Sequence, residues 1–251
     1  MTSQPWHESD KFWAAVASRL FPSERLEAAE SEVDAILGLA DADPGTEVLD
    51  MACGVGRHCL ALARRGFHVT AVDRTECYLR QAQEAAVAEN LQVEWVRSDM
   101  RRFRREDAFD VALSMFTSFG YFEDPADDRL VAQNFLASLR PGGVLIMEIM
   151  GKEVLARIFR PRDWSEGTNG ELWLEERMIR PGWDWIDNTW ILIEAGTRQE
   201  FSVGHRLYSA AELCHLLLEC GFASAEAYGN LEGAPYDHSA QRLVMVGRKS
   251  V

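Results

Sequence analysis

The 251-residue sequence predicts an α/β fold built on one mostly parallel sheet, and three observations support this prediction. Short apolar runs alternate with amphipathic stretches over residues 45–160. Successive apolar runs lie about 25 residues apart, a spacing typical of strand–helix–strand units. Each amphipathic stretch is long enough for a helix, so helices are expected to cover both faces of the sheet.

The elements are expected in the following order. Two helices come first, at 10–21 and 23–40, with Ser23 placed to cap the second. After the turn DADPGT, strands are expected at 47–50, 67–73, 93–99, 109–116 and 143–149. Helices are expected at 57–65, 76–90, 127–139 and 152–159. A helix at 210–220 and strands near 223–229 and 241–248 complete the core.

Residues 161–208 break this rhythm. They contain three expected strands, "ELWLEERMIR", "WDWIDNTWILIEA" and "TRQEFSVGHRLY", with turns at "PGW" and "EAGT". We therefore divide the chain into an N-terminal helical lid (1–44), a core (45–160 and 209–251) and a small antiparallel β insertion (161–208). Five of the eight tryptophans lie in or beside the insertion: Trp164, Trp173, Trp183, Trp185 and Trp190.

The amino-acid composition limits which kinds of partner this protein is expected to have. The net charge of −14 argues against a nucleic-acid partner, whose phosphates need a basic face. No apolar run approaches the ~20 residues that cross a bilayer, and no signal peptide is visible, so no membrane partner is expected. The five cysteines form no CxxC pair and the six histidines are scattered, so no metal site is expected. Unpaired thiols of this kind are typical of a cytoplasmic protein.

The segment "DMACGVG" directly follows the first core strand. Gly54 and Gly56 let the backbone turn tightly and approach a ligand, and the next helix begins there. Asp50, beside these glycines, would repel a pyrophosphate but suits a cationic or zwitterionic ligand.

Two further acids end the next two strands. Asp73 follows Asp50 by 23 residues, the place from which a carboxylate accepts hydrogen bonds from a ribose diol. Asp99 ends the third strand, where it can accept from the exocyclic amine of a purine. The alternative is that these acids only cap helices or end strands.

Four segments carry a resemblance to a known family: "VLDMACGVGRHCLALARRGFHVTAVD", "VEWVRSDM", "FDVALSMFTSFGYF" and "LRPGGVLIMEIMGKE". They resemble successive motifs of class I S-adenosylmethionine-dependent methyltransferases, in their small-molecule branch of antibiotic-tailoring and glycine- or sugar-amine-type enzymes. The resemblance covers roughly residues 45–150 and continues more weakly to the C-terminus. It implies a Rossmann-like, seven-stranded sheet whose last strand is antiparallel.

The resemblance also implies a set of cofactor-binding residues. The glycine turn would hold the amino-acid part of S-adenosylmethionine, Asp73 and Arg74 its ribose, and Asp99 and Met100 its adenine. Met115 and Phe116 would lie near the methionine portion and the reacting methyl. The full set is Asp50, Ala52, Cys53, Gly54, Gly56, Asp73, Arg74, Asp99, Met100, Met115 and Phe116.

The acceptor side is less explicit. His205 and Tyr121 are the candidate catalytic residues, although a histidine bonded only within the insertion is an equal alternative for His205. The candidate pocket and lid residues are Phe12, Trp13, Phe119, Tyr121, Arg206 and Tyr208. The alternative for the first helix is an amphipathic helix packed on the sheet edge. The insertion could cover the acceptor, form a homo-oligomer interface, or do both.

The expected function is transfer of a methyl group from S-adenosylmethionine to a small molecule, leaving S-adenosylhomocysteine. A nitrogen acceptor is favoured over oxygen because no metal set or obvious base is visible. The alternatives are a non-catalytic nucleoside-binding scaffold and a nicotinamide-dependent oxidoreductase. The oxidoreductase is disfavoured by Asp50 beside the turn and by Cys59 in place of a third glycine.

Overall fold

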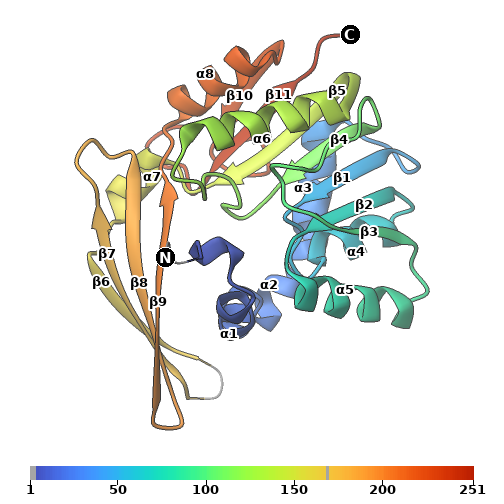
Figure 1. Ribbon diagram of the computed structural model, residues 1–251. Coiled ribbons are helices and arrows are strands. Elements are labelled where there is room, and N and C mark those ends of the chain that lie inside the picture. Colours follow the sequence, from blue (N-terminus) through green and yellow to red (C-terminus); the bar gives the residue numbers. More distant parts are fainter. Residues whose placement is uncertain (1–3, 168–169) are drawn as a thin grey trace.

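The computed structural model describes residues 4–167 and 170–251 and contains two sheets (Figure 1). The larger sheet has seven strands in the order β10-β11-β5-β4-β1-β2-β3. Its strands are β1 (Glu47–Met51), β2 (His68–Asp73), β3 (Val93–Arg97), β4 (Phe109–Ser114), β5 (Leu139–Ile149), β10 (Ser224–Tyr228) and β11 (Leu243–Arg248). Strand β11 runs antiparallel to both of its neighbours, β10 and β5, and the other pairs of this sheet are parallel. The predicted seven-stranded Rossmann-like sheet with an antiparallel last strand is confirmed.

Helices cover both faces of this sheet. On one face, α3 (Ala29–Ala40), α4 (Arg57–Arg64) and α5 (Glu76–Ala88) contribute to one buried apolar cluster. On the other face, α6 (Pro125–Ser138) and α8 (Ala210–Cys220) contribute to a second cluster. A short helix, α7 (Lys152–Ile158), follows β5 and leads into the second sheet.

The expected helix at 23–40 forms as two segments. Helix α2 (Ser23–Glu27) is separated from α3 at Ala28. The expectation that Ser23 caps the helix is wrong: Pro22 occupies the capping position, and no side chain caps the helix there. Proline fixes the backbone angle just before the first turn, so the helix starts without a serine cap.

The insertion folds as a separate antiparallel sheet of four strands, not the three expected. They are β6 (Arg162–Glu166), β7 (Leu172–Ile179), β8 (Trp185–Glu194) and β9 (Thr197–Arg206). The missed strand, β6, is an edge strand of mostly polar residues, "RDWSE", which pairs with β7 through its backbone. Because an edge strand buries little of either face, it lacks the apolar alternation by which strands are recognised.

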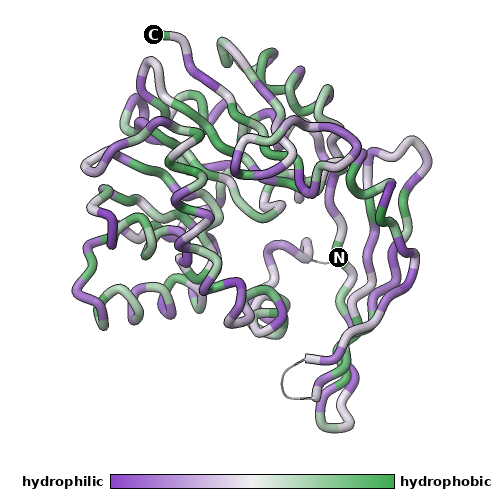
Figure 2. The backbone as a smooth tube through the Cα atoms, turned by 180° about the vertical axis from the view of Figure 1, so that it is seen from behind, coloured by the Kyte–Doolittle hydropathy of each residue, from purple (hydrophilic) through white to green (hydrophobic). Residues whose placement is uncertain are grey.

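The N-terminal segment lies between the two sheets. Figures 1 and 2 show η1 (Trp6–Glu8) and α1 (Asp10–Leu20) there from opposite sides. Phe12 packs in a buried cluster with Trp173, Leu192 and Val203 of the insertion. On the core side, the Tyr78 hydroxyl donates to the Trp13 carbonyl at 2.6 Å. The segment therefore bridges the core and the insertion.

Among the described residues, no helix has the length and apolar character needed to cross a membrane.

Candidate active site

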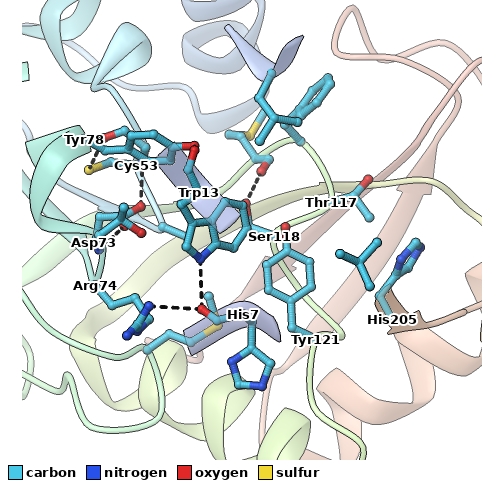
Figure 3. A pocket seen from close by; sticks show the side chains of 18 of the residues that line it. His7, Trp13, Cys53, Asp73, Arg74, Tyr78, Thr117, Ser118, Tyr121 and His205 are labelled. Atoms are coloured by element: carbon cyan, nitrogen blue, oxygen red, sulfur yellow. Dashed lines mark hydrogen bonds between the residues drawn. The ribbon is translucent and has the colours of Figure 1, made fainter. Parts of the chain in front are cut away.

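A cavity of about 380 Å³ lies at the carboxyl ends of the central core strands. The strand order reverses between β1 and β4, and ligands of such sheets bind outside this point. Helix α1 and the inner face of the four-stranded sheet complete the walls. Figure 3 shows Cys53, Asp73 and Tyr78 on one side of the cavity, Thr117, Tyr121 and His205 on the other, and Trp13 between them. The cavity thus has a side on the core strands and a side facing the insertion.

The glycine turn after β1 brings backbone into the cavity. Ala52 and Gly54 both have left-handed φ angles, of 62° and 58°. A Cβ atom on Gly54 would lie 2.8 Å from the Phe21 ring, so a side chain there would close the space. Gly56 does not line the cavity: a Cβ there would lie 2.8 Å from Trp95 and 3.0 Å from Ala82. The structure thus places Gly56 where α4 packs against Trp95, outside the lining of the cavity.

Every other expected cofactor residue lines the cavity: Asp50, Ala52, Cys53, Gly54, Asp73, Arg74, Asp99, Met100, Met115 and Phe116. Asp50 is buried and accepts from the Cys59 thiol at 3.0 Å. Burial raises the pKa of Asp50, and the neighbouring His58 and the Cys59 hydrogen bond partly oppose this rise.

The Asp73 carboxylate is anchored by backbone amides. Its two oxygens accept from Gly54 N at 2.9 Å and from Thr75 N at 2.7 Å. Burial raises its pKa, while these two hydrogen bonds act in the opposite direction. The Thr75 side chain adds a third hydrogen bond. A carboxylate has about four lone-pair sites, so about one remains for a ligand.

Asp99 is oriented by Arg101. The guanidinium donates to both carboxylate oxygens, at 3.0 and 2.7 Å, and the Arg101 amide donates at 2.8 Å. Burial acts to raise the pKa of Asp99, but the hydrogen bonds and charge of Arg101 outweigh it, so this pKa is lowered. The carboxylate is therefore held ionised at the edge of the cavity.

Arg74 contacts the N-terminal segment. Its guanidinium donates to the carbonyls of His7, at 3.2 Å, and Glu8, at 2.7 Å. It also forms an ion pair with Asp10 at 3.3 Å. Arg74 thus joins the end of β2 to the segment that covers the cavity.

The backbone after β4 is held in an uncommon conformation. Phe116 and Thr117 have φ angles of 59° and 60°, which cost of order 1–3 kcal/mol for residues other than glycine. Glu148 stabilises both, accepting from Phe116 N at its carboxylate (3.2 Å) and from Thr117 N at its carbonyl (2.9 Å). Arg242 pairs with the Glu148 carboxylate and donates to the Thr117 hydroxyl at 2.9 Å. This network fixes the strand end between the two sides of the cavity.

Arg25, from α2, is a cavity residue that the sequence analysis missed. Its guanidinium lies 3.9 Å from the centroid of the Phe116 ring and donates to the Leu20 carbonyl at 2.5 Å. The other arginines of the cavity pair with carboxylates: Arg57 with Glu32, Arg74 with Asp10, Arg177 with Glu175, and Arg242 with Glu148.

Within the described parts of the chain, Arg25 has no carboxylate at ion-pair distance. Burial lowers its pKa, and the nearby Arg57 and Arg242 lower it further. This cation is therefore available to an anionic ligand. Nothing in its short helix, "SERLE", indicated this position.

Four of the expected acceptor-side residues line the cavity: Phe12, Trp13, Tyr121 and His205. Burial, and then the charge of Arg242, lowers the pKa of His205 to about 4. Burial raises the pKa of Tyr121. Both side chains are therefore uncharged near neutral pH. Asn188, which also lines the cavity, was missed, although its place in the apolar alternation Ile186, Asn188, Trp190 is a signal.

The structure does not bring the other three expected residues, Phe119, Arg206 and Tyr208, to the cavity. Phe119 is buried in the core and packs against Tyr208, with ring centroids 5.6 Å apart. Arg206 and Tyr208 both donate to the buried Asp128, at 3.1 and 2.8 Å. Because strand residues alternate in direction, the inward position of His205 turns Arg206 to the other side.

Replacing Asp128 with asparagine is expected to change how stability depends on pH. Burial raises the pKa of Asp128 from 3.8 to about 6, so the folded state binds this proton more tightly than the unfolded state. The contribution of Asp128 to the free energy of unfolding is therefore greatest below pH 3.8, and it is lost as the pH rises through about 6. As the pH rises from 4 to 7.5, the free energy of unfolding of Asp128→Asn should therefore increase relative to that of the parent by up to about 3 kcal/mol. Urea unfolding at both pH values measures this gain, and a pH-independent difference would contradict the assignment.

The fold and the cavity together define a class. A parallel sheet with a glycine turn and acids at its carboxyl edge is a nucleoside-binding Rossmann-like protein. The residues also fit S-adenosylmethionine in particular. Asp73 has about one lone pair free, the space beside Gly54 would be filled by a Cβ, and Arg25 lacks an anionic partner among the described residues.

Comparison with known proteins finds methyltransferases. Residues 48–143 match a methyltransferase domain model. YqeM of Bacillus subtilis (strain 168), assigned to the methyltransferases, is 23% identical over 210 residues, covering 81% of this chain and 84% of that protein. Rat glycine N-methyltransferase is 30% identical over 127 residues, 45% of this chain and 43% of that protein. A Streptomyces venezuelae dTDP-3-amino-3,4,6-trideoxy-alpha-D-glucopyranose N,N-dimethyltransferase is 29% identical over 121 residues, 48% and 49%.

Solved structures support the same fold. The CcbJ methyltransferase from Streptomyces caelestis superposes with a TM-score of 0.76 at 22% identity, covering 89% of this chain and 95% of that one. DesVI of Streptomyces venezuelae gives a TM-score of 0.65 at 20% identity, covering 94% and 98%. Together these matches support a class I S-adenosylmethionine-dependent methyltransferase of small-molecule type, with S-adenosylmethionine as cofactor.

Proposed function

We propose that this methyltransferase transfers its methyl group by in-line displacement to a nitrogen atom of a small molecule. The bound cofactor supplies a methyl group on a positively charged sulfonium. The observation that carries the proposal is the uncharged character of His205 and Tyr121, which face the acceptor side of the cavity. Two N-methyltransferases among the relatives support it.

We assign the cofactor contacts from the geometry of the core side. Asp73 accepts from a ribose hydroxyl with the lone pair that Gly54 and Thr75 leave free. Asp99 and Met100 border the adenine. Arg25 binds the carboxylate of the methionine portion, because it is the cavity arginine without a carboxylate partner in the described residues.

The acceptor side favours an amine. A hydroxyl acceptor needs a general base with a pKa near the working pH, and a histidine with a pKa of about 4 is a weak base. An amine has only to arrive neutral.

The test uses S-adenosylmethionine with an isotopically labelled methyl group and a panel of small amines with matched alcohols and phenols. Tandem mass spectrometry locates the label. Label on nitrogen is the expected result, whereas label on oxygen would overturn the nitrogen assignment.

The pH profile of the reaction is expected to follow the acceptor amine. Replacing His205 with glutamine removes the imidazole but keeps a hydrogen-bonding group, so the pH profile of kcat/KM should keep its shape. The rate should fall by less than the roughly 100-fold that loss of a general base causes. A His205→Gln profile that loses an ionisation near pH 4 would instead identify the imidazole as a base.

A further inference from the structure

The inner face of the insertion sheet carries two polar side chains with unused hydrogen-bonding capacity. Ile186, Asn188 and Trp190 alternate along β8 and all line the cavity. Strand pairing places Ile186 opposite His205 and Asn188 opposite Val203. Asn188 and His205 are therefore diagonal neighbours on one face, with Cβ atoms within about 7 Å of each other.

Neither side chain has a partner among the residues that the structure describes. Asn188 is 7% exposed, yet its amide forms no hydrogen bond there, and neither does the His205 ring. Both side chains border the open space of the cavity, so a ligand there can hydrogen-bond to them.

The arginines around Asn188 and His205 already form ion pairs with carboxylates. Arg177, the cross-strand neighbour of Asn188, pairs with Glu175, and Arg242 pairs with Glu148. An anionic acceptor group would have to displace one of these pairs. The remaining capacity belongs to the amide and to the neutral imidazole, each of which both donates and accepts. The surrounding wall is apolar, formed by Phe12, Trp190 and Val203.

We propose that Asn188 and His205 form a specificity site that recognises an uncharged hydroxyl group on the acceptor amine. A hydroxyl both donates and accepts, so it can bridge the two side chains. This inference rests on the proposed function, since it names a feature of the molecule that receives the methyl group.

The test measures ligand binding to protein loaded with S-adenosylhomocysteine. The probes are cyclohexylamine and 2-, 3- and 4-aminocyclohexanol, which share one ring and differ only in the hydroxyl. Ligand-observed NMR titration gives each dissociation constant. The variants are Asn188→Leu and His205→Phe, each of similar size to the parent residue. Thr189→Val is the matched control, because Thr189 is the next residue on β8 and lines the outer face of the sheet.

At least one aminocyclohexanol should bind the parent roughly tenfold more tightly than cyclohexylamine, since a site built for a hydroxyl rejects the analogue without it. Asn188→Leu and His205→Phe should each abolish this preference, and Thr189→Val should retain it. All three variants should bind S-adenosylhomocysteine like the parent, which also shows that they are folded.

Two results would overturn the specificity site while leaving the methyltransferase assignment intact. One is that S-adenosylhomocysteine binds but no aminocyclohexanol binds better than cyclohexylamine. The other is that the preference persists in both Asn188→Leu and His205→Phe. Absence of S-adenosylhomocysteine binding to the parent would instead overturn the proposed function, and this inference with it.

Discussion

Replacing Arg25 with methionine is expected to weaken S-adenosylhomocysteine binding roughly 30- to 150-fold, or about 2–3 kcal/mol, as truncating one partner of a buried charge pair does. Methionine keeps an unbranched apolar side chain but removes the guanidinium, which lies 3.9 Å from the centroid of the Phe116 ring. The loss follows from the arrangement of the cavity, where Arg25 is the arginine that the described carboxylates leave unpaired.

Isothermal titration calorimetry measures this loss, with 5′-methylthioadenosine as a second ligand. That nucleoside contains the adenine and ribose but lacks the amino-acid portion, so Arg25→Met should leave its affinity unchanged. Arg80→Met, at an exposed position on α5, is the control and should bind both ligands like the parent. An equal loss for both ligands would show that Arg25 acts through the fold of the cavity and not through the carboxylate.

Replacing Asp73 with asparagine is expected to weaken S-adenosylhomocysteine and 5′-methylthioadenosine alike, by roughly 100-fold. Hydrogen bonds to a charged group contribute about 1.5–3 kcal/mol each, and an amide has only one oxygen to serve the backbone and the ribose. Since both ligands contain the ribose, they should lose affinity together, in contrast to the Arg25 variant.

The control for this change is Asp43→Asn, at an exposed position in the turn before β1. Thermal unfolding checks that the glycine turn survives, because the Asp73 carboxylate also accepts from Gly54 and Thr75. A folded Asp73→Asn protein that binds both ligands with undiminished affinity would remove the ribose assignment.

Much of the core followed from local pattern. The strand-end acids Asp50, Asp73 and Asp99 were expected at one edge of the sheet, and all three line the cavity. Parallel strands end at the same edge, so residues at equivalent places in successive strands converge without further information. The expected site residues that do not line the cavity are not placed by this rule. Gly56 serves helix packing, and Arg206 and Tyr208 bind Asp128, an acid 78 and 80 residues away in sequence.

The insertion likewise could be predicted from the sequence only in part. Its existence was visible in turn residues and apolar alternation, but its edge strand β6 was not, because β6 is held by backbone pairing with β7 and carries polar side chains. The cavity-facing role of Asn188 depends on which face of β8 meets the core. A polar residue in an apolar register hints at such a role, but only the packing of the two sheets shows that the face is covered.

The sequence by itself determined the cofactor class, because the glycine turn and the acids are placed by contacts between neighbouring elements of one repeated unit. Only the tertiary structure decided the rest of the site. It placed Arg25 without a carboxylate partner in the described residues, turned Arg206 away from the cavity, and set Asn188 beside His205. Those positions depend on how the N-terminal segment and the four-stranded sheet close over the core. The physical reason is that such closure is fixed by long-range packing and by which charges find partners, and neither has a local sequence pattern.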